Sequence, residues 1–433
     1  MSFKIENGVL KKYIQEEGVK DVVIPDGVSV IESWAFYRCK GIETVSMPNS
    51  VTRIGQCAFK WCSNMKKIKF SESLTHIEVY AFEECRNLTS IIIPQSIEEI
   101  SFGAFRNCIR LADISVPADF IGFSSRVFEN TRWEKNYPDD FVIINDLLYL
   151  YKGNEKSINI PDSVKIIGQY ALAFSDIESV TVSDCVDEIR DSAFGGCKKL
   201  VSVTLPDSIK KINMHTFYNC ESLEKINLPD SIEEIGFEAF NGCRKLSDIK
   251  LPKNLKVLGM KAFKDNAWLK NSNSDFIIIG SVLSAYCGNK KVVNIPESVT
   301  VIEGAAFGGC NGITEIRMSD KVTQIGNGAF SGCTALEKIE LSKNLKIIGH
   351  AAFQDCHALK EISIPESVTE MGTIVFENCE ELTSIKLSTN IVQIGEEIFC
   401  GHAPELCVFV ENECFAAKYT RKHKVKCKIL ESI

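Results

Sequence analysis

The chain has 433 residues, of which 45% are hydrophobic and 24% charged, and its formal net charge is −8. This is the composition of an ordinary soluble globular protein, and the acidic balance lacks the basic footprint expected of a nucleic-acid-binding protein. No apolar run approaches the roughly 18 residues of a membrane span, and residues 1–10 lack the features of a secretory signal, so we expect no membrane span and, for the chain as given, a cytoplasmic location.

The first predicted element is a β-hairpin. Residues 3–13 contain two runs of alternating apolar residues around Asn7-Gly8, a pair that tolerates the positive φ of a tight hairpin turn. We expect this hairpin, within residues 1–24, to cap the open N-terminal edge of the following sheet.

A 23-residue repeat begins in residues 25–138. Its most regular member is phenylalanine, which Leu172 replaces in one shortened copy. The fifteen slots are Phe36, Phe59, Phe82, Phe105, Phe128, Leu172, Phe194, Phe217, Phe240, Phe263, Phe307, Phe330, Phe353, Phe376 and Phe399. A coil of this length cannot bury its apolar side alone, so we expect the copies to stack.

Each repeat predicts a strand, a corner and a short turn. "LTSIII" at 88–93 ends in the alternation of a strand with one buried face, and Pro94, which lacks an amide hydrogen, ends the strand pairing. The segment Val/Ile-x-x-Ile-Gly directs two apolar residues inward, and its glycine, such as Gly55, suits an unusual backbone angle or a close approach. Ala-Phe-x-x-Cys-x-x-Leu has the spacing of one short helical turn.

Two further hairpins divide the repeats. Residues 140–164 and 275–299 align without gaps at an offset of 135, with turn candidates at Asn145-Asp146 and Gly280-Ser281. We therefore predict repeat blocks at 25–138, 139–273 and 274–404, the second and third each introduced by a hairpin. Trp133 and Trp268 also align, and we expect them to close the core where the hairpins interrupt the stack.

The last segment, residues 405–433, breaks the 23-residue period. Its pattern predicts a strand at 406–410, a helix at 413–422 and a strand at 425–430. We therefore expect a C-terminal β-α-β cap.

The repeat resembles a known family. The string Leu-x-x-Ile-x-Leu is similar to a leucine-rich repeat, and Ile-Pro-x-Ser-Val-x-x-Ile-Gly-x-x-Ala-Phe-x-x-Cys resembles the BspA-like, or Treponema pallidum-type, subclass from residue 25 to about 400. The resemblance implies an α/β repeat solenoid: a right-handed stack of coils with a parallel β-sheet on one face, short helices or turns on the other, and inserted β-hairpins. It also implies adhesion-type binding to host or matrix proteins, often at a bacterial or protist surface.

Eleven of the eighteen cysteines occupy one slot of the repeat: Cys39, Cys62, Cys85, Cys108, Cys197, Cys220, Cys243, Cys310, Cys333, Cys356 and Cys379. Side chains in register point the same way and do not meet as a disulfide requires, so we expect buried free thiols, as in a reducing compartment. Cys400, His402, Cys407 and Cys414 have the ligand types of a zinc site without the spacing of a knuckle, so we predict no metal and no cofactor.

The sequence contains no catalytic motif. It lacks the Gly-x-Ser-x-Gly elbow, His-Glu-x-x-His and the phosphate-binding loop, so we predict that the protein is not an enzyme. Two functions fit: a scaffold for protein–protein or protein–glycan interaction, adhesion-like at a cell surface if the family role holds, or an intracellular interaction or structural repeat protein with an unknown partner. We expect a monomer.

A partner-binding face is predicted on the strands. Residues that flank the central isoleucine of each strand should project from the exposed face of the sheet, as curved solenoids commonly use such a face for recognition. The predicted residues are Lys67, Lys69, Ile92, Asp113, Lys225, Asn227, Asp248, Lys250, Glu315, Arg317, Lys338, Glu340, Glu361 and Lys386. They are polar, mixed in charge and nearly free of aromatics, which favours a modest or multivalent interaction, and they also fit solvated strand faces.

Overall fold

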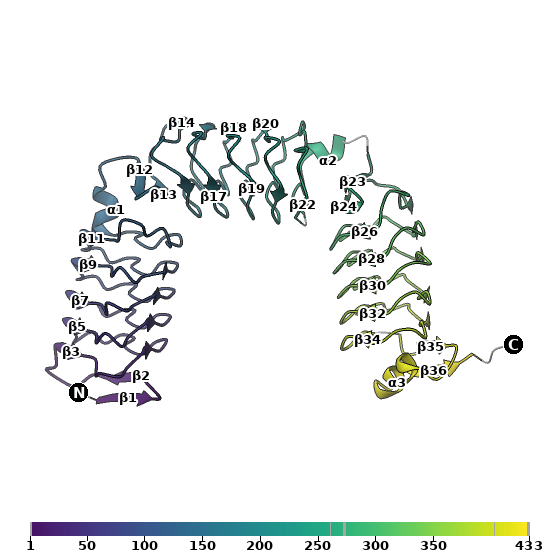
Figure 1. The fold of residues 1–433 in the computed structure, drawn as a ribbon, viewed down its shortest axis with the longest axis horizontal. Helices are drawn as coiled ribbons and strands as arrows, with labels where there is room; N and C mark the ends of the chain where they lie inside the picture. The colour runs from purple at the N-terminus through teal and green to yellow at the C-terminus, as the bar shows by residue number, and fades with distance from the viewer. Residues whose placement is uncertain (1, 260, 272–273, 402, 431–433) are drawn as a thin grey trace. The chain divides into compact units, whose positions relative to one another are not determined.

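In the computed structural model, each 23-residue repeat forms one coil of a β-solenoid (Figure 1). The structure describes residues 2–259, 261–271, 274–401 and 403–430. The chain forms two units, residues 1–229 and 230–433, and each is described by itself. The predicted repeat solenoid is confirmed. The finer division into five segments remains a prediction.

One strand of each coil is the predicted Leu-x-x-Ile-x-Leu strand. These strands are β3 (Asp21–Val23), β5 (Thr44–Ser46), β7 (Lys67–Lys69), β9 (Ser90–Ile92), β11 (Asp113–Ser115), β14 (Ser157–Asn159), β16 (Ser179–Thr181), β18 (Ser202–Thr204), β20 (Lys225–Asn227), β25 (Val292–Asn294), β27 (Glu315–Arg317), β29 (Lys338–Glu340), β31 (Glu361–Ser363) and β33 (Ser384–Lys386). Within five separate sheets, neighbouring copies pair in parallel and in register, as in Thr44 opposite Lys67. The central residue points inward and its two neighbours point to solvent.

A second set of parallel strands, which the sequence did not predict, is formed by the Val/Ile-x-x-Ile segments and is divided among four sheets. Its strands are β4 (Val30–Ile31), β6 (Arg53–Ile54), β8 (His76–Ile77), β10 (Glu99–Ile100), β15 (Ile166–Ile167), β17 (Glu188–Ile189), β19 (Lys211–Ile212), β21 (Glu234–Ile235), β22 (Val257–Leu258), β26 (Val301–Ile302), β28 (Gln324–Ile325), β30 (Ile347–Ile348), β32 (Glu370–Met371) and β34 (Gln393–Ile394). Each strand has only two residues, which is too short for sequence alternation to reveal.

The three predicted hairpins are present. They are β1 (Ser2–Glu6) with β2 (Val9–Ile14), β12 (Phe141–Ile144) with β13 (Leu147–Tyr151), and β23 (Phe276–Ile279) with β24 (Val282–Tyr286). Asn7 and Gly8 have φ of 50° and 76°, as a tight hairpin turn requires. The second strand of each hairpin pairs in parallel with the first two-residue strand of the following coils, so the hairpins begin the second sheet and not the predicted one.

The corner glycines allow close approach between coils. A Cβ atom at Gly55 would lie 2.6 Å from the backbone nitrogen of Ser33, and one at Gly326 would lie 2.5 Å from the backbone nitrogen of Gly304. A real side chain cannot occupy such a space without moving the backbone. Close approach, one of the two reasons predicted for this glycine, therefore explains these corners.

The Ala-Phe-x-x-Cys segment is a chain of turns and not a helix. In all fifteen copies the residues two before and two after the core residue have positive φ, for example 66° at Trp34 and 60° at Arg38 around Phe36. The alternating conformation directs amide hydrogens towards the next coil, so the Phe36 N–H donates to the carbonyl of Ala58 at 2.7 Å. The phenylalanine rings stack along the core, with centroids 4.5 Å apart for Phe36 and Phe59.

The hairpin β12–β13 ends this ladder of hydrogen bonds and starts the next one. The Phe128 N–H, in the last coil before the hairpin, donates to Tyr149 Oη at 2.9 Å. The Tyr151 N–H donates to the carbonyl of Ala171, in the first coil after it, at 2.7 Å. Two residues of one strand therefore connect two stacks of coils.

Short helices precede the inserted hairpins. They are α1 (Arg132–Asn136) and α2 (Ala267–Asn271). The Trp133 ring is only partly buried, and its centroid lies 5.2 Å from that of Phe128; Trp268 lies 4.9 Å from Phe263 in the same way. The tryptophans thus pack on the last ring of each stack, as predicted, but from its edge.

The C-terminal cap has the predicted elements: β35 (Cys407–Val410), α3 (Phe415–Lys422) and β36 (Lys426–Ile429). Strand β35 pairs in parallel with β33, and β36 pairs with β35, so the cap extends the sheet of three-residue strands. None of the helices in the described part of the chain has the length and apolar character needed to cross a membrane.

Candidate functional site

The structure places twelve of the fourteen predicted binding residues on three-residue strands. Asp248 and Lys250 are exposed, but residues 248–250 form no strand, and Asp248 makes only an isolated bridge. The other twelve are divided among five separate sheets in the two units. The predicted continuous row of binding residues is therefore divided into several short, separate surfaces.

Charges on the face of β27 and β29 neutralise one another. Arg317 Nε lies 2.9 Å from Glu315 Oε1, and Lys338 Nζ lies 2.7 Å from Glu340 Oε1 and 3.7 Å from Glu315 Oε1. The hydrogen bond to Glu340 raises the pKa of Lys338, and the same bond lowers the pKa of Glu340. Exposed pairs of this kind contribute little to stability, but they leave little net charge for a partner.

The face of β7 and β9 differs in shape and in charge. These two strands belong to different sheets, and between them lies a cavity of about 360 Å³. Its lining includes Lys67, Lys69 and the 74% exposed Ile92, three of the residues predicted from the sequence. Within the described residues neither lysine forms an ion pair, and the lining also includes one acidic residue, Glu72. We name this recess the β7–β9 groove.

A phenylalanine lines the gap between these strands. Phe70 occupies the slot after the strand that Met47 and Ile93 hold in the adjacent coils. The ring packs edge-on against Phe82, with centroids 5.7 Å apart and an interplanar angle of 77°. A similar break separates β29 from β31, where Leu341 occupies this slot, so the larger side chain by itself does not explain the gap.

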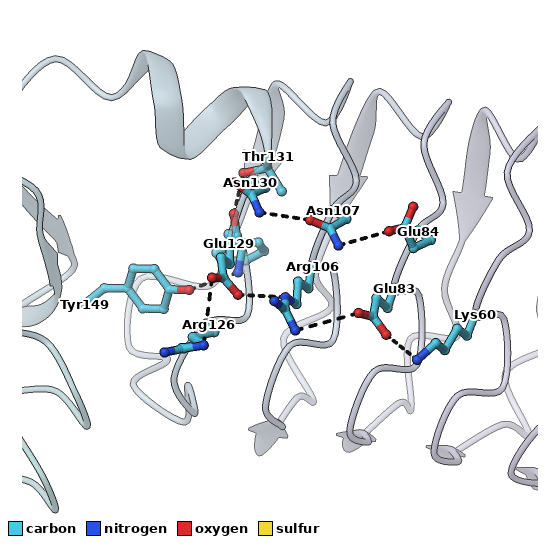
Figure 2. Close-up of polar contacts among 11 residues, drawn as sticks. Lys60, Glu83, Glu84, Arg106, Asn107, Arg126, Glu129, Asn130, Thr131 and Tyr149 are labelled. Carbon is cyan, nitrogen blue, oxygen red and sulfur yellow. Dashed lines mark hydrogen bonds and ion pairs between the residues drawn. The ribbon is translucent and has the colours of Figure 1, made fainter. Parts of the chain in front are cut away.

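A second polar surface lies on the turn face of the first block (Figure 2). Glu83, only 7% exposed, lies 2.5 Å from Lys60 Nζ, and Arg106 Nε lies 2.7 Å from Glu129 Oε2. In the neighbouring row, Asn107 donates to Glu84 at 3.0 Å. These rows fix the orientation of Glu129 at the last coil of the block, where the sequence predicted no site.

The cysteine ladder is structural. All eighteen cysteines are free, and the repeat thiols donate to a carbonyl of the preceding coil, as Cys62 Sγ does to Phe36 O at 3.1 Å. Burial raises the pKa of Cys39 to about 11 and that of Cys379 to about 12, so these thiols are poor nucleophiles and poor metal ligands at neutral pH.

The weak zinc candidate at the C-terminus is not assembled in the described part of the chain. Among the described residues, no three side chains of His, Cys, Asp or Glu gather as a metal site requires. His402 lies outside the described residues.

Comparison with known proteins identifies the repeat. The family model described as "BspA type Leucine rich repeat region" matches six copies, over residues 11–134, 142–272 and 277–404. No curated protein matches the chain. The matched residues make up most of the chain.

Comparison with solved structures finds other leucine-rich repeat proteins. A leucine-rich repeat protein from Bacteroides ovatus is 22% identical, over 99% of this chain and 97% of that chain, with a TM-score of 0.38. A leucine-rich cell surface protein from Faecalibacterium prausnitzii is 24% identical, over 90% of each chain, with a TM-score of 0.33. The T. pallidum leucine-rich repeat protein is 24% identical, over 57% of this chain and 88% of that chain, with a TM-score of 0.25.

Proposed function

The chain belongs to the BspA-type leucine-rich repeat family, and from this premise we propose that it is a non-enzymatic scaffold that binds a protein partner through the exposed faces of its three-residue strands. The β7–β9 groove is the centre of this proposal. It combines a recess, an exposed aliphatic side chain at Ile92 and two lysines, Lys67 and Lys69, that form no ion pair within the described residues. The one acidic residue of the lining, Glu72, leaves an excess of positive charge.

The chemistry of the groove favours a particular kind of partner. Lysines that carry no ion pair attract carboxylates, and complementary charge raises association rates and selects partners. Ile92 adds apolar area that a partner side chain would cover. We therefore propose an extended acidic segment of a protein, with an apolar side chain next to the acidic ones, as the occupant.

Two cellular settings remain open for this binding. Adhesion at a cell surface is the finer form of the proposal and follows the family resemblance. An intracellular interaction is the alternative, and the eighteen free thiols favour it because disulfides are rare in reducing compartments. Separation of cell fractions followed by immunodetection of the protein distinguishes the two.

Charge reversal tests the binding proposal. Wild type, Lys67→Glu with Lys69→Glu, and the control Lys210→Glu, an exposed lysine of the same unit, are each used as bait. We expect at least one directly interacting protein to be captured by wild type and by the control but not by the double variant. The purified partner should bind wild type at least about 10-fold more tightly than it binds the double variant, because two buried charge contacts are worth more than about 1.4 kcal/mol. Equal retention by all three baits would place the binding surface elsewhere.

A further inference from the structure

The interruption of the stack by α1 and the β12–β13 hairpin is accompanied by a groove whose lining differs from that of the regular repeats. Two cavities, of about 300 Å³ and 350 Å³, lie at this interruption and share Gln169 in their linings. Both lie within the first unit. We name their combined surface the first-junction groove.

Buried polar atoms line the first cavity. Ser125 is 5% exposed, and its hydroxyl has no hydrogen-bond partner among the described residues. Tyr149 is 6% exposed, and its oxygen accepts the Phe128 N–H, which leaves its own hydrogen available for donation. Figure 2 shows the Tyr149 ring reaching towards the last coil of the first block. A buried polar group without a partner is costly, so these hydroxyls favour a ligand that supplies hydrogen bonds.

Two aromatic side chains form the rim of the same cavity. Phe174 is 68% exposed and Tyr170 is 38% exposed, although aromatic rings are normally covered. The Phe174 ring lies directly on the backbone of Gly196, where a Cβ atom would be 2.5 Å from its Cδ1. The absence of a side chain at Gly196 therefore leaves room for an exposed ring in a fixed position.

The groove carries charges of both signs, with more acidic than basic groups. Its carboxyl groups belong to Glu129, Glu134, Glu188 and Asp191, and its guanidinium groups belong to Arg126 and Arg190. Arg190 is engaged on both sides, since it donates to the carbonyl of Ile121 at 3.0 Å and lies 3.3 Å from Glu188 Oε1. The excess of carboxyl groups opposes a strongly anionic ligand, and the two guanidinium groups reduce the attraction for a cationic one.

One carboxyl suits a neutral ligand in particular. Burial raises the pKa of Glu134 to about 7, so this group is partly protonated near neutral pH and can then donate as well as accept a hydrogen bond. A ligand hydroxyl has the same dual capacity.

The second hairpin interruption provides an internal comparison. At an offset of 135 residues, the positions of Glu134, Tyr149 and Gln169 are occupied at the second junction by Leu269, Ser284 and Gly304, in that order. Ala305 and Gly309 stand for the aromatic pair Tyr170 and Phe174. The cavity there measures about 150 Å³ and is lined mainly by apolar and small residues. The polar and aromatic lining of the first junction is therefore not needed to insert a hairpin.

We propose that the first-junction groove binds a neutral oligosaccharide. The faces of Phe174 and Tyr170 would cover the apolar face of a sugar ring, while Gln169, Glu134, Ser125 and Tyr149 would exchange hydrogen bonds with its hydroxyl groups. Two adjoining cavities give room for more than one ring, and a recess with aromatic walls and a few placed polar groups is the usual form of a small-ligand site. This site is separate from the β7–β9 groove, and either can exist without the other.

Glycan binding by the full chain tests the proposal. The probes are immobilised neutral oligosaccharides of glucose, galactose, mannose and N-acetylglucosamine, with sulfated and sialylated glycans and basic peptides on the same array. We expect saturable binding to one or more neutral members, quantified by titration calorimetry. Phe174→Ala and Gln169→Ala should each weaken this binding by about 10-fold or more, as loss of a well-placed contact does. The control Gln324→Ala, at an exposed residue of the second unit, should bind as wild type does.

The outcomes separate this proposal from the previous one. Binding confined to charged glycans or basic peptides, no binding at millimolar concentration, or neutral-glycan binding unaffected by both variants would each overturn it. Circular dichroism of the variants checks that they are folded, and Phe174 is exposed enough for its truncation to leave the core intact. Lys67→Glu with Lys69→Glu should retain the glycan, and Phe174→Ala should retain the protein partner of the β7–β9 groove.

Discussion

The hydroxyl of Tyr149 is expected to hold together the two stacks of coils that meet at the first hairpin. It accepts the Phe128 N–H at 2.9 Å in a site where Tyr149 is 6% exposed. In Tyr149→Phe the ring remains and the acceptor is lost. The Phe128 N–H then stays buried without a partner, unlike the equivalent amides of Phe36 and Phe59, which are bonded to the next coil.

The cost of this change follows from the burial of the site. A buried donor that loses its partner costs about 1–3 kcal/mol. Most of this cost should appear as easier opening of the junction, because the coils on either side keep their own hydrogen bonds. A cost of about 1–2 kcal/mol raises the open population by a factor of about 5–30.

Hydrogen exchange measured by mass spectrometry detects this opening. We expect the peptide covering residues 126–131 to exchange faster in Tyr149→Phe by that factor, while peptides of the second unit keep the wild-type rate. Tyr13→Phe is the matched control, because Tyr13 is 2% exposed and its hydroxyl has no hydrogen-bond partner among the described residues. Unchanged exchange in Tyr149→Phe, or equal acceleration in the control, would refute the structural role of the hydroxyl.

Three further predictions follow from burial. Titration of the denatured protein should find eighteen free thiols, while the native protein should react mainly at exposed residues such as Cys185 and Cys400; extensive disulfide bonding would contradict this. Trp133→Ala should lower the free energy of unfolding in urea by about 2 kcal/mol, less than the roughly 3–5 kcal/mol of a fully buried aromatic, because the ring is partly exposed. A change near zero would show that it does not close the core. Burial raises the pKa of Glu134 from 4.5 to about 7, so the folded state keeps a proton that the unfolded chain releases, and stability should fall as the pH rises through this window. Glu134→Gln should remove that fall and be the more stable protein at pH values above about 7; parallel pH profiles of variant and wild type would contradict the assignment.

The features predicted correctly from the sequence are those that each repeat or hairpin encodes locally. The residue types of Asn7-Gly8 predict a hairpin turn, and the 23-residue spacing of Phe36 and Phe59 predicts a stack of coils. The left-handed backbone at Trp34 could not be predicted in this way, because a bulky aromatic residue rarely adopts positive φ. Hydrogen bonds between coils impose this conformation, and they exist only once the coils are stacked.

The candidate sites were harder to predict for a related reason. Lys67, Lys69 and Ile92 were identified by their place in the period, but the groove between them depends on the separation of β7 and β9 into different sheets, which arises only in the stacked chain. The first-junction groove brings Gln169 next to Glu129, forty residues away in the chain, by means of the inserted hairpin. Neither effect is visible in one repeat.

A periodic stack opposes the formation of unique sites. Each coil meets neighbours of the same shape, so their side chains interdigitate equally along the core and leave a continuous surface. A recess with a lining unlike that of the other coils requires a local departure from the repeat. In the first unit the β7–β9 groove lies where two neighbouring strands belong to different sheets, and the insertion of α1 and β12–β13 accompanies the first-junction groove. The second interruption carries Ser284 and Gly304 where the first carries Tyr149 and Gln169, so hairpin insertion itself demands neither side chain. Tyr149 serves the fold of the first junction by accepting the Phe128 N–H, whereas Gln169 at the centre of the groove is the residue that a ligand explains better than the fold does.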